Sequence, residues 1–197
     1  MHDHVVTVTD DLPVLPFADA AALEAWLEEN HATAPGLYVK IAKKGTGIPS
    51  VDWEQMVEVL LCFGWIDGRA NRLDDSFYLQ RITPRRPKSV WSLKNVATVE
   101  RLIAEGRMRP AGLAAVEAAK ADGRWERAYE GPATITVPDD LAAALDAVPA
   151  ARAAFDALKG QDRYSVLHRV HTAATGKTRA ARIAAAVELL TRAGQPG

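Results

Sequence analysis

Basic residues gather in one short stretch of this chain, where they could bind an anion. Between Arg81 and Val99 the sequence has five basic residues and no acidic one. The planar fork of an arginine side chain matches phosphate and carboxylate groups. Two prolines, Pro84 and Pro87, stiffen the stretch and lower the entropy cost of presenting the arginines between them. The five basic residues are Arg81, Arg85, Arg86, Lys88 and Lys94.

The basic stretch leads directly into a predicted helix. Ser92 is a typical N-cap, and the apolar residues from Val96 to Ile103 have helical spacing, so the helix should run to about residue 105. Free backbone N–H groups and the helix dipole favour an anion at such a start, to which Ser89 and Ser92 could add hydroxyl groups.

A polar hairpin precedes the basic stretch. Two strands are predicted over residues 65–72 and 77–83. One face of the first strand carries Asp67 and Arg69, and a face with these charges must be solvated, ion-paired or ligand-facing. Gly68 in the same strand predicts a bulge or a close backbone approach.

We expect the hairpin and the basic loop to form one ligand site for an anion. In a second interpretation, the arginines pair with Asp67, Asp74 and Asp75 and only stabilise the fold. In a third, the basic surface binds nucleic acid, which would require a continuous basic face and steep salt dependence. The candidate ligand-binding residues are Trp65, Asp67, Arg69, Arg81, Arg85, Arg86, Lys88, Ser89, Trp91 and Ser92.

An enzyme acting on an anionic small molecule is the alternative to a binding protein. Asp67 would be its acid or base, and the arginines would hold the charge of the substrate. No nucleophile with a paired base is evident, because Ser89 and Ser92 have no histidine near them in the sequence. A non-catalytic protein would take an anionic small molecule or an acidic protein segment as its partner.

The sequence predicts no metal site and no cofactor. His168 and His171 share a helical face, but two histidines without further ligands do not make a zinc site. His2 and His4 stand in a stretch that is typical of a mobile terminus. The single cysteine, Cys62, falls at the apolar end of a predicted helix, so packing is expected of it rather than reactivity.

The loop at residues 43–49 (KKGTGIP) combines lysines and glycines, as phosphate-binding loops do. It lacks the GxxxxGK[ST] spacing of a P-loop. Two interpretations are open, a solvated turn and a basic flap over a nearby site.

Composition and charge describe an ordinary globular chain. Its 197 residues are 48% hydrophobic and 25% charged, enough for one sizeable domain or two small ones. A net charge of -1 gives no overall attraction to nucleic acid or membranes, so electrostatic binding must come from a local patch. The N-terminus lacks the features of a signal peptide, and no apolar run is long enough to span a bilayer. We therefore expect a cytoplasmic protein.

The hydrophobic pattern predicts an α+β fold. A small antiparallel sheet with packed helices is expected in the N-terminal half, followed by a C-terminal helical bundle. The expected division is residues 1–107 for the α+β part and 108–197 for the helical part, packed as one unit. In the helical part, Asp162 and Thr178 are predicted to cap the last two helices.

The N-terminal half should contain one central core helix. Apolar residues from Trp53 to Leu61 have helical spacing, and Asp52 with Gln55 has the pattern of a capping box. A further helix is predicted over residues 19–30, and a strand with one buried face over residues 37–42.

Several of these runs resemble the YdeI/OmpD-associated family, whose members are also labelled bacteriocin-protection proteins. The resemblance implies a role in resistance to cationic antimicrobial peptides and envelope stress, and it implies no catalytic residues. A basic site would repel a cationic peptide, so its ligand in such a role would be an anionic metabolite, nucleotide, lipid head group or acidic protein segment. The resemblance covers nearly the whole chain, through residues 61–68 (LCFGWIDG), 73–75 (LDD), 80–86 (QRITPRR), 90–92 (VWS), 123–125 (GRW), 137–139 (VPD) and the basic C-terminal helix.

Overall fold

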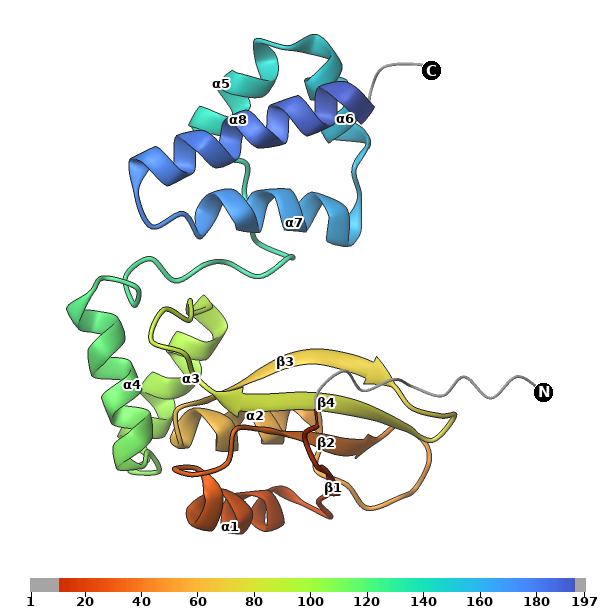
Figure 1. The fold of residues 1–197 in the computed structure, drawn as a ribbon, viewed down its shortest axis with the longest axis vertical. Coiled ribbons are helices and arrows are strands. Elements are labelled where there is room, and N and C mark those ends of the chain that lie inside the picture. The colour runs from red at the N-terminus through yellow and green to blue at the C-terminus, as the bar shows by residue number, and fades with distance from the viewer. Residues whose placement is uncertain (1–10, 194–197) are drawn as a thin grey trace. The chain divides into compact units, whose positions relative to one another are not determined.

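The described part of the chain, residues 11–193 of this computed structural model, divides into two compact units. The first unit contains the described residues up to Ser89 together with Ala97–Asp122. The second contains Val90–Val96 and the described residues from Gly123 onward. A sheet lies in the first unit and helices α5 to α8 lie in the second (Figure 1). The predicted α+β class is confirmed.

A four-stranded sheet forms the centre of the first unit. Its strands are β1 (Val14–Pro16), β2 (Leu37–Ala42), β3 (Trp65–Arg72) and β4 (Phe77–Pro84), in the order β1-β2-β4-β3. The predicted hairpin is present, since β3 and β4 pair antiparallel. Strand β4 also pairs antiparallel with β2, in keeping with the antiparallel sheet that the sequence predicts. In addition, β1 pairs parallel with β2, so the sheet is mixed. The sequence pattern does not predict β1, because a strand of three residues is too short to show alternation.

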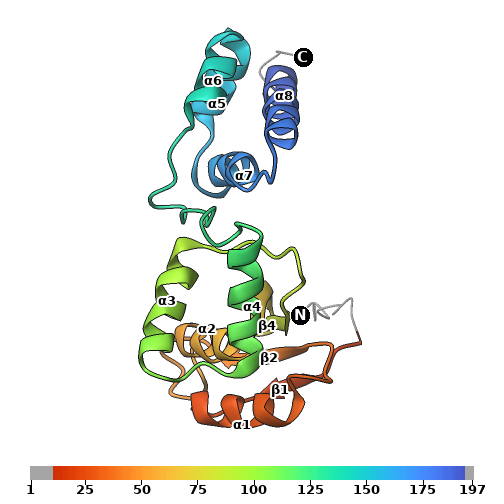
Figure 2. The ribbon, with the colours of Figure 1, turned by 90° about the vertical axis from the view of Figure 1, so that its left-hand side faces the viewer.

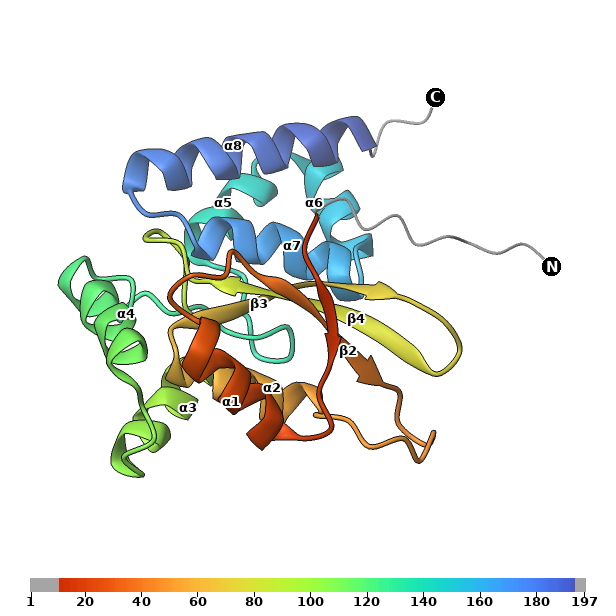
Figure 3. The same cartoon turned by 60° about the horizontal axis from the view of Figure 1, so that its bottom comes forward.

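Helices α1 (Ala20–Asn30) and α2 (Trp53–Cys62) cover the same face of this sheet (Figure 3). In α1 the ring of Trp26 meets the ring of Trp65 edge-on, with 6.0 Å between their centroids. In α2 the apolar side chains, among them Leu60, are buried against the same face. This face therefore carries the core of the first unit.

The start of α2 confirms one prediction and corrects another. Asp52 and Gln55 form the predicted capping box, with Gln55 N donating to Asp52 Oδ1 at 2.8 Å and Asp52 N donating to Gln55 Oε1 at 3.2 Å. Trp53, which was expected on the core-facing stripe, has 37% of its surface exposed. Its indole turns to the edge of the sheet, where Nε1 donates to Asp67 Oδ2 at 3.2 Å.

Helices α3 (Leu93–Ala104) and α4 (Pro110–Ala121) follow the sheet in the chain, and α4 lies very close to the end of α2. A Cβ atom on Gly112 would stand 2.2 Å from the carbonyl oxygen of Cys62, closer than real Cβ atoms come to any heavy atom. Gly64 ends α2 with a φ of +71°, and a Cβ atom there would stand 2.8 Å from the α4 backbone. Only glycine therefore fits at these two positions.

Four helices pack as a bundle in the second unit (Figure 2): α5 (Asp139–Asp146), α6 (Pro149–Ala157), α7 (Gly160–His171) and α8 (Gly176–Ala193). Within residues 11–193, no helix is both long enough and apolar enough to span a bilayer. The buried core of the bundle consists of Leu141, Leu145, Ala151, Phe155, Leu167, Val170, Ile183 and Leu190.

The last two helices start earlier than predicted. Helix α7 begins at Gly160, so Asp162 lies in its first turn and is not its cap. Helix α8 begins at Gly176, and its capping side chain is Thr175, whose Oγ1 accepts the backbone N–H of Thr178 at 3.1 Å. Thr175 and Thr178 are both of a residue type that caps helices. Capping by Thr175 makes the helix start earlier than capping by Thr178 would.

We expect the substitution Gly112→Ala to lower the free energy of unfolding by about 2 kcal/mol. The added methyl group would force the backbone of α4 away from the end of α2. Urea denaturation of the whole chain measures this change.

Gly131→Ala is the matched control, because its added methyl group meets nothing within 4 Å. Its free energy of unfolding should change by less than about 0.5 kcal/mol. If Gly112→Ala were as stable as the control, the close approach of α4 to α2 would be disproved.

Candidate functional site

A bulge divides the β3–β4 hairpin. The register shifts after Asp67, so that Gly68 and Arg69 together face Arg81. The buried side chain of Gln80 holds the bulge, since its Nε2 donates to the carbonyl oxygen of Gly68 at 2.7 Å. The bulge predicted at Gly68 is therefore present, and it leaves Arg69 exposed.

Trp65 lies in the core of the first unit. Only 1% of its surface is exposed, and its Nε1 donates to the carbonyl oxygen of His31 at 3.2 Å. Its ring also packs edge-on against Trp26. The ring therefore offers no free face for stacking on a ligand.

Asp67 and Arg81 point to opposite faces of the sheet. Asp67 pairs with Ile82, which is fully buried, and both face the helices α1 and α2 because paired residues share a face. Arg81 is the neighbour of Ile82 in β4, so it points the other way. This geometry separates the candidate acid or base from the arginine that would hold its substrate.

The carboxylates at the hairpin turn serve the turn itself. Asp74 Oδ1 accepts the backbone N–H groups of Ser76 and Phe77 at 2.8 and 2.7 Å, and these bonds lower the pKa of Asp74. Asp75 pairs with Arg72 at 3.0 Å. Among residues 11–193, neither carboxylate forms an ion pair with an arginine of the loop after β4.

A tight turn closes the basic loop, and we call residues 85–89 the basic turn. Ser89 N donates to the carbonyl oxygen of Arg86 at 2.9 Å, and Arg86 N donates to Ser89 Oγ at 3.1 Å. Arg85 N donates to the carbonyl oxygen of Gly64 at 3.0 Å, which ties the turn to the end of α2. The backbone of the turn is thus held at both ends.

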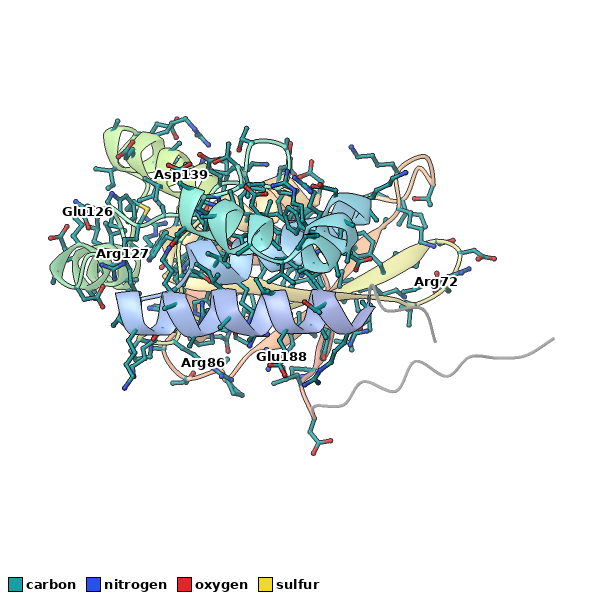
Figure 4. All side chains as sticks on the ribbon, turned by 90° about the horizontal axis from the view of Figure 1, so that it is seen from above. Arg72, Arg86, Glu126, Arg127, Asp139 and Glu188 are labelled. Carbon is teal, nitrogen blue, oxygen red and sulfur yellow. The ribbon has the colours of Figure 1, made fainter. Side chains whose placement is uncertain are left out.

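The cations of the basic turn differ in exposure. Arg85 is half-buried, and its Nε and Nη2 atoms are fully buried. Arg86 and Lys88 are exposed, and no carboxylate of residues 11–193 pairs with either of them. Arg86 lies at the far end of the β3–β4 ribbon from Arg72, which occupies the hairpin end (Figure 4). Arg86 and Lys88 are therefore the cations that the turn presents to solvent.

Trp91 and Ser92 belong to the second unit, unlike the other candidate residues. Trp91 is 1% exposed, and its ring packs edge-on against Trp125 with 5.0 Å between centroids. Like Trp65, it contributes to a core and not to an open surface.

Ser92 caps α3 as predicted. Its Oγ accepts the backbone N–H of Asn95 at 3.1 Å, and its carbonyl oxygen accepts that of Val96 at 3.0 Å. The N–H of Leu93 donates to the carbonyl oxygen of Tyr129 at 2.9 Å. Because these donors are already engaged, the start of α3 has few left for an anion.

The two histidines of α7 do not form a metal site. Within residues 11–193, no group of three or more His, Cys, Asp or Glu side chains could hold a metal ion. His168 packs against two tyrosine rings, and burial lowers its pKa. His171 Nε2 lies 3.0 Å from the carbonyl oxygen of Thr136. His2 and His4 fall outside the described residues.

A groove of about 720 Å³ runs along α5 and α8 in the second unit. Its walls include four alanines together with Ile183 and Val187, and the ion pair of Arg179 and Asp140 at 2.6 Å lies among its lining. An alanine-rich pattern does not distinguish a groove wall from a solvated face, so the sequence does not reveal this groove. Its two carboxylates, Asp140 and Glu188, are each ion-paired with an arginine, and its lining has no serine, threonine, cysteine or histidine.

Cys62 is buried at the end of α2, with 1% of its surface exposed. Burial raises the pKa of its thiol, although the charge of Arg107 opposes this shift. The thiolate, which is the reactive form, is therefore scarce at neutral pH.

We expect Cys62 to react with an aromatic disulfide reagent at least about a hundredfold more slowly in the native protein than in the urea-unfolded chain. Absorbance of the released aromatic thiolate at mildly alkaline pH gives both rates. A native rate close to the unfolded one would mean that the end of α2 opens readily.

Two family models match the chain. Residues 15–115 match the family described as Domain of unknown function (DUF8412). Residues 134–193 match the family described as Bacteriocin-protection, YdeI or OmpD-Associated. The predicted resemblance is thus confirmed over residues 134–193, whereas the runs between residues 61 and 92 lie in the other match. No curated protein and no solved structure matches the chain significantly.

Proposed function

The chain belongs to the family described as Domain of unknown function (DUF8412), and from that premise we propose that it is a binding protein that captures an anion on its basic turn. We place this binding in bacteriocin protection, which the description of the second matching family names. The ligand would be an anionic small molecule or an acidic segment of a partner protein.

One observation carries this proposal: Arg86 and Lys88 are exposed on a turn whose backbone is fixed, and no carboxylate of residues 11–193 pairs with them. A fixed backbone reduces the entropy that these side chains lose when they bind. Arg86 can offer two parallel N–H donors to a carboxylate or phosphate, and Lys88 adds a second positive charge.

The remaining cations have lesser parts in this proposal. Arg69 is exposed in the bulge of β3 and adds positive charge to the same unit. Arg81 and Arg85 are only partly exposed, so we assign them to support of the fold. Ser89 acts through its hydroxyl group, which closes the turn.

The sign of the charge decides how bacteriocin protection would operate. Many antimicrobial peptides are cationic, and exposed arginine and lysine side chains would repel them. The chain would therefore act on an anionic intermediary, and it would not sequester the peptide at this turn. We do not extend the proposal to a reaction, because Asp67 and Arg81 face opposite sides of the sheet.

We expect the double substitution Arg86→Ala with Lys88→Ala to abolish anion binding at the basic turn and leave the fold intact. A thermal-shift screen would use phosphate, nucleotides, dicarboxylates, lipid head groups and acidic peptides. A ligand at about 100 times its Kd stabilises the wild type by roughly 2.7 kcal/mol, which raises Tm by about 5–10 °C. The double variant should show no such rise.

Arg72→Ala with Lys44→Ala is the matched control, since it also removes two exposed positive charges from the first unit. This control should retain the full rise in Tm, because Arg72 lies at the opposite end of the ribbon (Figure 4). An equal loss in both double variants would point to net charge alone and overturn the assignment to the basic turn. Absence of any stabilising anion for the wild type would overturn the proposed function.

A further inference from the structure

A pocket of about 350 Å³ lies in the first unit, away from the basic turn. Its lining comes from the end of β1, from the loop before α2, and from one residue each of β2 and β4. The residues are 16–18, 48–50, Lys40 and Phe77. Its volume is at the small end of the range for small-molecule sites.

The pairing of the strands brings Lys40 and Phe77 to the same side of the sheet. Lys40 pairs with Leu79, which lies two positions from Phe77 in β4, and side chains two apart in a strand share a face. Lys40 Nζ stands 4.1 Å from the centroid of the Phe77 ring, a cation–π contact. Pro16 of β1 pairs with Lys40 from the other side.

The ammonium group of Lys40 keeps donors available for a ligand. Within residues 11–193 no carboxylate forms an ion pair with it, and its contact with Phe77 uses a ring face, which accepts no conventional hydrogen bond. Ser50 is occupied, since its Oγ accepts Ala42 N at 3.1 Å and donates to the carbonyl oxygen of Val51 at 3.0 Å. Lys40 is thus the charged donor of a pocket that is otherwise mainly apolar.

The neighbouring charges limit what Lys40 could hold. Lys43 Nζ donates to the carbonyl oxygen of Asp74 at 2.7 Å, so it is directed to the hairpin. The carboxylate of Asp74 is near enough to be influenced by both lysines, although its main partners are the backbone N–H groups of Ser76 and Phe77. A second negative charge on the ligand would therefore meet repulsion from Asp74.

We propose that this pocket binds a small monocarboxylate with an apolar body, such as an aromatic or branched-chain acid. The carboxylate would accept hydrogen bonds from Lys40 Nζ, and the apolar body would lie against Phe17, Phe77 and the loop residues Ile48 and Pro49. Ile48 has 40% of its surface exposed, so a ligand would shield apolar area that now faces water.

In the proposed site, the loop at residues 43–49 forms part of the pocket wall. The two interpretations of its sequence were a solvated turn and a basic flap. The loop lines the pocket with Ile48 and Pro49, while Lys43 serves the hairpin. Gly45 and Gly47 adopt φ angles of +87° and +70°, and these conformations allow the loop to turn back over the pocket.

Isothermal titration calorimetry of the full chain with phenylacetate tests the proposal. We expect saturable binding, weaker binding of the neutral isostere phenylacetamide, and weaker binding of the dianion phenylmalonate. Lys40→Met keeps an unbranched apolar side chain and removes the charge, and it should weaken phenylacetate binding by at least about tenfold. Ile48→Ser should weaken phenylacetate binding but not the response to acetate, which lacks the apolar body.

Lys44→Met is the matched control, because Lys44 is an exposed lysine of the 43–49 loop that does not line the pocket. The Lys44→Met variant should bind phenylacetate as the wild type does. Arg86→Ala with Lys88→Ala should also bind normally, which separates this site from the basic turn. The proposal is overturned if the wild type shows no saturable binding of phenylacetate at millimolar concentrations, or if phenylacetamide binds equally well. It is also overturned if Lys40→Met binds phenylacetate as the wild type does and has the same urea unfolding curve. Loss of binding in the Arg86 and Lys88 variant would assign the carboxylate to the basic turn instead.

Discussion

The end of α2 determines where much of the first unit can lie. Backbone carbonyl groups at this end accept hydrogen bonds from distant segments. The carbonyl oxygen of Cys62 accepts Arg109 N, and that of Gly64, just after the helix, accepts Arg85 N, each at 3.0 Å. Helix α4 reaches the same point only because Gly112 has no side chain. The position of the charged turn thus depends on packing and backbone bonds that carry no net charge. Uncharged contacts of this kind are insensitive to salt, whereas the anion binding that we propose for the turn would weaken as salt is added.

Local chemistry made part of this fold predictable from sequence. The capping box of Asp52 and Gln55, the cap at Ser92 and the bulge at Gly68 each depend on a few neighbouring residues, and each is present. The β3–β4 hairpin was predictable for the same reason, because its strands are joined by a short turn whose carboxylate, Asp74, stabilises it directly.

The face that each side chain presents was not predictable, because it depends on which side of the sheet the helices cover. Alternation correctly puts Trp65 and Asp67 on one face of β3, but that face is the one against α1 and α2. In the basic loop, composition alone could not tell the half-buried Arg85 from the exposed Arg86, since burial depends on segments distant in the sequence, such as Gly64, whose carbonyl oxygen accepts Arg85 N. Lys40 gave no signal of a pocket, because its partners come from other strands and a loop.

The two outer strands of the sheet also bear on how this chain behaves among copies of itself. An edge strand with free N–H and C=O groups can recruit a strand of another molecule, which leads to aggregation. At one edge β1 has three residues and ends in Pro16, which lacks an N–H group. At the other edge the bulge in β3 interrupts the regular spacing and places the charged Arg69 there. Short length, proline, an irregular backbone and charge all oppose added strands, so the sheet is protected against growth at both ends.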